Sequence, residues 1–446
     1  MNDQLTHGRV FAIAGPAMLA NLTTPLLGIV ATGVIGQLGE AHLLGGVAMA
    51  SVVFDCLFWL FGFLRMSTVA LTAQALGAHD PVEVRASLAR GLLIAGLASM
   101  ILLVVQKPLS AITFHLMGAS EPVTDAARLY FDVRLWSAPF LLANYAVLGW
   151  LIGQARTGWA LTIQIAVNLI NIASTVLLVI VLKHGVAGAA SAAIIAEACG
   201  VVFGLTLAAR ILGRDGFRIP RTILFDRAKL KRMMGINRDI FIRTLALTGA
   251  FLFFTAQGAR EGDVVLAANA VLNNFAMIGS FFLDGLATAA EQLSGYSLGA
   301  RDRARFLRTT RLVLGWSMVF AVAVALALAV GGPALIDLMT TSADVREAAR
   351  AFMWLATLAP VCGVMAYAFD GIYIGATWAR EMRNLMLMSL ATYFAAWAAL
   401  QPLGNTGLWL ALLIFLLARG GFQALRYRTL LETSFAGPLT PAILPR

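Results

Sequence analysis

The sequence has few charged side chains for its length. Asp, Glu, Lys and Arg make up only 13% of the 446 residues, whereas 60% of the residues are hydrophobic and the mean hydropathy is +0.82. A soluble globule needs polar groups over its surface, and this composition supplies too few of them. The composition therefore excludes a soluble protein and indicates an integral membrane protein.

Residues and motifs that carry enzyme chemistry are also scarce. The three cysteines, Cys56, Cys199 and Cys362, lie in apolar runs, where a small buried hydrophobe is the ordinary interpretation. The five histidines are scattered, and the chain has no HExxH, GxSxG or P-loop pattern. We therefore expect no enzyme activity, no disulfide, no metal site and no cofactor.

The net charge of +10 is arranged by loop. Lys and Arg concentrate in 85–90, 210–238, 301–311, 380–383 and 426–428, whereas the intervening loops carry few of them. This alternation is the positive-inside pattern. It predicts a multi-pass protein of a bacterial-type cytoplasmic membrane with both termini in the cytoplasm, and it favours a role in topology over nucleic-acid binding.

Apolar runs long enough to cross the bilayer recur along the whole chain, since a helical span needs about 20 residues. We predict twelve spans, at 10–36, 43–76, 88–106, 124–153, 158–182, 186–209, 240–258, 264–298, 309–332, 346–376, 384–401 and 405–425. The N-terminal MNDQLTHGR lacks the pattern of a cleavable signal, so we expect the first span to stay in the mature protein.

The chain repeats itself at one constant offset of 222 residues. The matching segments are ALGAHD (75–80) with SLGARD (297–302), MGASEPVTDAARLYF (117–131) with MTTSADVREAARAFM (339–353), and GWLIGQA (149–155) with GIYIGAT (371–377). Six spans per repeat put both repeats in the same orientation, related by an axis along the membrane normal. The prediction is an all-α integral membrane fold of two six-helix lobes with the transport pathway between them.

The repeat also predicts a division of the chain. The expected parts are an N-lobe at 1–209, a basic cytoplasmic linker at 210–239, a C-lobe at 240–428 and a cytoplasmic tail at 429–446.

Polar side chains inside apolar spans are candidates for function because they are costly there. Span 158–182 carries Gln164, Asn168, Asn171 and Thr175 at steps of four, three and four, which places them on one helical face. They could line a hydrated pocket or join helices by hydrogen bonds, and the sequence favours neither.

Acidic residues mark three other spans. Asp284 and Glu291 share a face of span 264–298, and a cavity role is favoured for them over a buried structural pair; Tyr367 and Asp370 share a face of span 346–376, and Asp55 lies in span 43–76. Glu197 in span 186–209 is a secondary candidate. Asp239 and Arg243 are four residues apart, a spacing that predicts a local ion pair.

Several segments resemble one transporter family. NLTTPLLGIVATGVIG, FLRMSTVALTAQALGA, NRDIFIRT and DGIYIGATWAREMRN, together with the repeat, are similar to the multidrug and toxic compound extrusion (MATE) family and to its DinF branch. The resemblance implies a twelve-helix, two-lobe exporter that exchanges small organic, often cationic or amphipathic, compounds for protons or sodium ions. We expect the protein to be a monomer. It also places Asp370 where the family often has a C-lobe carboxylate.

The chain departs from the family at two positions. Relatives usually carry an aspartate where this chain has Ala31, and an acid where it has Thr175. The hypothesis is that ion coupling rests on Asp55, Asp284, Glu291 and Asp370, while Asn168, Asn171 and Thr175 line the N-lobe pocket. The alternatives are an uncoupled or degenerate facilitator, and a flippase for a lipid-linked precursor.

Overall fold

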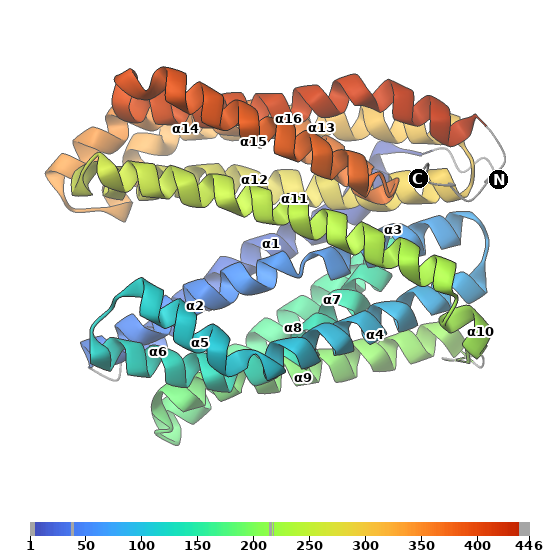
Figure 1. Ribbon diagram of the computed structural model, residues 1–446, viewed down its shortest axis with the longest axis horizontal. Helices are drawn as coiled ribbons and strands as arrows, with labels where there is room; N and C mark the ends of the chain where they lie inside the picture. Colours follow the sequence, from blue (N-terminus) through green and yellow to red (C-terminus); the bar gives the residue numbers. More distant parts are fainter. Residues whose placement is uncertain (1–4, 37–39, 214–215, 217, 437–446) are drawn as a thin grey trace. The chain divides into compact units, whose positions relative to one another are not determined.

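The computed structural model describes residues 5–36, 40–213, 216 and 218–436, except for the side chains of 24–32 and 41. The described residues form helices and contain no strand (Figure 1). The helices are α1 (His7–Gly36), α2 (Ala41–Leu60), α3 (Phe63–Gly77), α4 (Pro81–Val104), α5 (Gln106–Met117), α6 (Glu121–Arg134), η1 (Leu135–Ser137), α7 (Ala138–Gly153), α8 (Thr157–Thr175), η2 (Val176–Val181), α9 (Gly185–Leu212), α10 (Arg221–Leu224), α11 (Arg227–Arg260), α12 (Asp263–Gly299), α13 (Arg303–Met339), α14 (Ala343–Gly375), α15 (Ala379–Leu400), η4 (Gln401–Leu403) and α16 (Gly404–Phe435).

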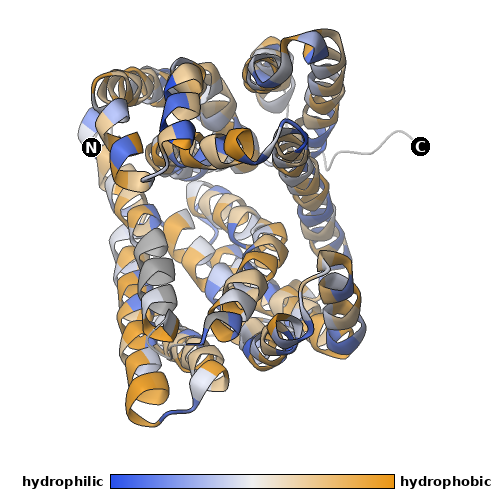
Figure 2. Ribbon diagram, turned by 90° about the vertical axis from the view of Figure 1, so that its left-hand side faces the viewer, coloured by the Kyte–Doolittle hydropathy of each residue, from blue (hydrophilic) through white to orange (hydrophobic). Residues whose placement is uncertain are grey.

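Within the described residues, ten helical stretches are long and apolar enough to cross a membrane. One of them, Ala379–Phe435, comprises α15, η4 and α16 and so contains two of the twelve predicted spans. The first predicted span coincides with α1, some of whose side chains lie outside the described residues. Hydrophobic residues occur along the length of most helices (Figure 2), as helical membrane spans require.

The helices differ from the predicted spans where the chain turns. The predicted span 43–76 is two helices, α2 and α3, separated by a turn at Phe61 and Gly62, and the span 124–153 is α6, η1 and α7. Pro139 lies in the first turn of α7, where its missing N–H costs no helical hydrogen bond. The short helix α5 was not predicted, because its polar residues conceal it from a hydropathy scan.

The chain forms two compact units. The N-terminal unit comprises residues 15–76 and 80–237, and the C-terminal unit comprises 1–14, 77–79 and 238–446. Most of the basic segment 210–239 falls within the N-terminal unit. Arg90 on α4, which is 2% exposed, holds it there by donating hydrogen bonds to the carbonyl oxygens of Ile223 at 2.5 Å and Leu224 at 3.2 Å, at the end of α10.

The sequence repeat is also a structural repeat. Asp80 accepts a hydrogen bond from the backbone N–H of Glu83 at 2.9 Å, and Asp302, 222 residues later, accepts one from Arg305 at 2.8 Å. Each aspartate caps the N-terminus of the next helix. The residues before the two caps, His79 and Arg301, share a left-handed backbone with φ of 56° and 55°.

Equivalent glycines set the closest helix contacts in both units. A Cβ atom on Gly149 of α7 would come within 2.6 Å of the carbonyl oxygen of Arg65 on α3. A Cβ atom on Gly371 of α14 would meet the carbonyl oxygen of Ala287 on α12, and both of these residues are displaced by 222 from the first pair. The repeated glycines therefore mark backbone-to-backbone packing.

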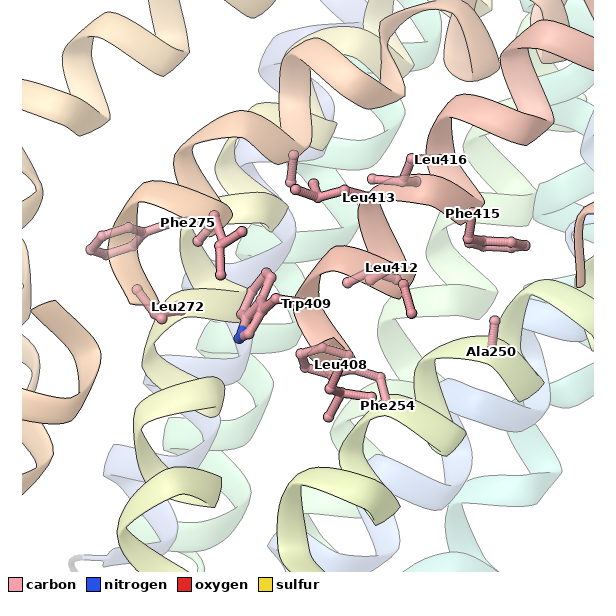
Figure 3. Close-up of a cluster of buried hydrophobic side chains, with 14 of the residues drawn as sticks. Ala250, Phe254, Leu272, Phe275, Leu408, Trp409, Leu412, Leu413, Phe415 and Leu416 are labelled. Atoms are coloured by element: carbon pink, nitrogen blue, oxygen red, sulfur yellow. The ribbon is translucent and has the colours of Figure 1, made fainter. Parts of the chain in front are cut away.

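The core of the C-terminal unit draws side chains from α11 to α16, and Figure 3 shows the part formed by α11, α12 and α16. Trp409 of α16 is fully buried, and its ring lies 4.9 Å from that of Phe254 on α11. Its indole N–H donates to Asn269 of α12 at 2.9 Å. Asn269 also exchanges two hydrogen bonds, of 2.7 and 3.0 Å, with Asn405, so both amides and the indole of this cluster are hydrogen-bonded.

Candidate functional site

Asp370 on α14 is the centre of a buried ionic network in the C-terminal unit. Its Oδ2 accepts hydrogen bonds from Arg243 on α11 and from Arg419 on α16, the latter at 2.8 Å, and its Oδ1 accepts one from Gln423 at 2.7 Å. All four residues are at most 6% exposed. The network ties three helices together and leaves neither carboxylate oxygen without a partner.

The predicted local pair of Asp239 with Arg243 is wrong. Arg243 binds Asp370, and Asp239 instead accepts hydrogen bonds from Arg238 at 3.0 Å and from Arg383 on α15 at 2.7 Å. The spacing of Asp239 and Arg243 along one helix predicted that they would pair. In the structure, Asp370 on α14 binds Arg243, and Arg383 on α15 binds Asp239.

A second polar group of the C-terminal unit lies along α12. The hydroxyl groups of Tyr367 and Ser280 are 2.6 Å apart, and Asp284, one turn beyond Ser280, is exposed on the surface of the unit. Glu291, two turns further along, is 3% exposed. The two acids of α12 therefore differ in environment although they share a helical face.

The polar face of α8 in the N-terminal unit joins helices. Asn168, which is 7% exposed, donates to the hydroxyl group of Thr23 on α1 at 3.1 Å and accepts from Gln164 at 3.3 Å. Thr175 donates to Asn171 at 3.4 Å. The Asn168 contact joins α8 to α1, whereas the Gln164–Asn168 and Asn171–Thr175 contacts lie along α8 itself.

Two other predicted positions of the N-terminal unit, Asp55 and Ala31, lie in α2 and α1. Asp55 is exposed on α2, next to Phe54, whose ring lies 4.1 Å from the guanidinium carbon of Arg134. Ala31 lies in α1, but its side chain is outside the described residues.

Sequence reasoning missed three buried participants. Arg419 and Gln423, which hold Asp370, are in the last span, where no helical pattern linked them to it. Asn144 on α7 was also missed; its Nδ2 donates to Oε2 of Glu197 on α9 at 2.6 Å and to the Glu197 carbonyl oxygen at 3.0 Å. The sequence marks these residues only as single amide or cationic side chains inside apolar spans, and it does not indicate their partners.

Comparison with known proteins places these observations in a family. The MatE family model matches residues 16–177 and 240–395, which is most of the chain. The chain is 38% identical to DNA damage-inducible protein F of Escherichia coli (strain K12) over 408 residues, which cover 92% of this chain and 89% of that protein. It is 26% identical to the probable multidrug resistance protein NorM of Caulobacter vibrioides over 455 residues, covering 94% of this chain and 90% of that protein.

Solved structures show the same fold. A crystal structure described as MATE in the bent conformation has a TM-score of 0.86, with 18% identity and 96% of each chain covered. A mutant of the Vibrio cholerae MATE transporter VcmN has a TM-score of 0.87, with 18% identity, covering 97% of this chain and 98% of that one. The family match, the DinF relative and the repeated all-helical fold agree, and the chain belongs to the MatE family of multidrug efflux transporters.

Proposed function

We propose that this protein is a secondary active exporter, rather than an enzyme, that exchanges small organic compounds, often cationic or amphipathic, for protons or sodium ions by alternating access. The observation that carries the proposal is the pair of apolar helical units, related by a repeat, that each enclose ionisable side chains. Such side chains are costly in hydrocarbon and mark ion or substrate pathways. The names of two relatives, a DNA damage-inducible protein and a probable multidrug resistance protein, support export of toxic compounds.

The contacts suggest different roles for the predicted site residues. Because Asp370 already has two guanidinium partners and an amide partner, we assign it to holding Arg243 and Arg419 in place. Asp284 is exposed on its unit, beside the Tyr367–Ser280 contact, and is the better candidate for exchanging a coupling ion with substrate. Asp55 and Glu291 remain in the proposed set, with Asn168, Asn171 and Thr175 lining the N-terminal unit.

The test is ethidium flux in proteoliposomes that contain the full chain, driven first by a proton gradient and then by a sodium gradient. The native protein is expected to transport ethidium in the direction opposite to the flow of one of these two ions. The Asp284→Asn variant is expected to lose this coupled flux. Glu432→Gln, at an exposed acid near the end of α16, is the control and should transport normally. If the native chain moves ethidium under neither gradient, the exporter proposal fails.

One alternative has specific support. Ala31 and Thr175 occupy positions where relatives usually have acids, which favours an uncoupled facilitator. In the same assay a facilitator equilibrates ethidium without responding to either gradient. A gain of gradient dependence in Ala31→Asp alone would identify the native chain as uncoupled.

A further inference from the structure

Asn144 and Glu197 form an acid–amide contact inside the N-terminal unit. The Asn144 amide nitrogen donates to Oε2 of Glu197 at 2.6 Å and to its carbonyl oxygen at 3.0 Å, and Asn144 is 4% exposed. Gly200, on the next turn of α9, makes room for this contact, because a Cβ atom there would come within 2.8 Å of the amide nitrogen. The sequence therefore leaves space for this particular pair.

One atom of the contact lacks a partner. Oδ1 of Asn144 is buried and accepts no hydrogen bond within the described residues. Leaving a buried acceptor unpaired costs about 1–3 kcal/mol. A carboxylate only accepts hydrogen bonds, whereas a protonated carboxyl group also donates one. A protonated Glu197 carboxyl group would thus have an O–H donor for Oδ1 of Asn144, the amide that it already contacts.

The alternative occupant, a metal cation, suits the contact less well. Hard cations in proteins take about six oxygen ligands. The contact offers three oxygens, namely the two carboxyl oxygens of Glu197 and Oδ1 of Asn144. The described residues contain no group of three or more acidic, histidine or cysteine side chains that could hold a metal ion. The chemistry of the contact therefore favours a proton.

The charged groups around Glu197 come from the helices that pack on α9, which include α6, α7 and α8. Arg134, at the end of α6, acts on Glu197 electrostatically. Tyr145, beside Asn144 on α7, interacts electrostatically with Glu197, Arg134, Arg65 and Asp55. The sequence of α8 contains no ionisable side chain.

Arg134 is placed to balance a negative charge. Its Nη1 donates to the hydroxyl group of Tyr130 at 2.9 Å, its guanidinium lies over the Phe54 ring, and its Nε is buried without a hydrogen-bond partner within the described residues. A cation that acts on a carboxyl group electrostatically, as Arg134 does on Glu197, stabilises the ionised form of that group.

We propose that Glu197 binds and releases a proton during transport, a role that rests on the proposed exporter function. Asn144 holds the protonated form through the acid–amide pair, and Arg134 balances the ionised form after the proton passes to water. Each form favours a different arrangement of the N-terminal unit, so proton occupancy can shift the populations of transport states. Glu197 thereby supplies a titratable group to a unit whose Ala31 and Thr175 cannot titrate.

The test compares the native chain with Glu197→Gln. Glutamine can pair with Asn144 as Asn269 pairs with Asn405 in the C-terminal unit, so this variant keeps the contact and should fold. Addition of ethidium to the native protein in weakly buffered detergent solution should release protons, and Glu197→Gln should lose this release while still binding ethidium. Glu432→Gln should behave as the native protein does.

A second measurement separates this inference from the proposed function. Infrared difference spectra between acidic and alkaline pH should show the C=O band of a protonated carboxyl group that is missing from Glu197→Gln and present in Glu432→Gln. If native protein neither binds nor moves ethidium, the exporter proposal fails and the infrared band alone decides the role of Glu197. An identical band in native protein and Glu197→Gln overturns the inference, as does unchanged proton release from the variant.

Discussion

Asp370 shows how a charge is kept inside an apolar helical unit. Two guanidinium groups and one amide surround its carboxylate, and every member of the network is buried. Taking such charges out of water is costly, and the cost is recovered only while all partners are present. Because each partner comes from α11 or α16, the network makes the packing of three helices depend on a single residue.

Neutralising Asp370 is therefore expected to destabilise the protein. Asp370→Asn leaves two buried guanidinium groups without a counter-ion, a change that costs about 3–5 kcal/mol. The measurement is the midpoint of thermal unfolding of the detergent-solubilised protein. The control is Asp337→Asn, since Asp337 pairs with Arg350 at 2.6 Å but its side chain is 43% exposed, and exposed pairs contribute only about 0–1 kcal/mol. Equal midpoints for the two variants would contradict a structural role for Asp370.

At the scale of helices, repeated glycines determine how closely pairs can pack. Gly371 and Gly375 of α14 face the carbonyl oxygens of Ala287 and Glu291 on α12, and Gly149 and Gly153 of α7 face those of Arg65 and Val69 on α3. Each residue of the second set is 222 positions before its counterpart. The conserved spacing within the chain thus preserves a backbone contact, even though the side chains around it differ between the units.

A methyl group at Gly371 should separate α12 from α14. Gly371→Ala is expected to lower the free energy of unfolding by about 1–3 kcal/mol. The new Cβ atom would meet backbone atoms of α12, which can give way only if the helix itself shifts. Gly149→Ala should have an effect of the same sign, since the Arg65 carbonyl oxygen lies 2.6 Å from its Cβ position.

Thermal midpoints in detergent measure both glycine effects. Gly331→Ala in α13 is the matched control, because a Cβ atom there meets nothing within 4 Å. Replacing a helical glycine at such an open position stabilises by about 0.5–1 kcal/mol. A neutral or stabilising Gly371→Ala would show that the two helices can separate without cost.

At the scale of the whole molecule, the distribution of positive charge predicts the orientation in the membrane. The basic residues of 210–238, 301–311 and 426–428 alternate with loops that carry few, such as the one around Lys183. The translocation machinery retains positively charged loops in the cytoplasm. We therefore expect both termini in the cytoplasm and the loop after the fifth span on the opposite side.

Reporter fusions test this orientation in a bacterial host. A fluorescent protein fused after Arg446 should fluoresce, because it folds in the cytoplasm, and alkaline phosphatase fused at the same point should be inactive. Alkaline phosphatase fused after Lys183 should be active. The reverse result at both positions would mean that the chain inserts with the opposite polarity.

The amino-acid sequence alone determined the membrane environment, the helical class and the duplication. Each depends on information that is local or periodic: apolar runs of sufficient length, and equal spacing between Gly149 and Gly371 or between Asp80 and Asp302. The family resemblance followed from the same segments, and the comparisons agree with it. Helix interruptions such as the turn between α2 and α3 escaped prediction, because composition does not change there.

Only the tertiary structure decided which polar groups meet. Arg243 could pair with Asp239 by helical spacing, yet it binds Asp370, which is 127 positions away along the chain. Asn144 and Glu197 are 53 positions apart and carry no shared pattern. A polar side chain inside an apolar span needs a hydrogen-bonding or ionic partner, and the sequence shows which side chains have this need. The packing of the helices decides which partner each of them meets.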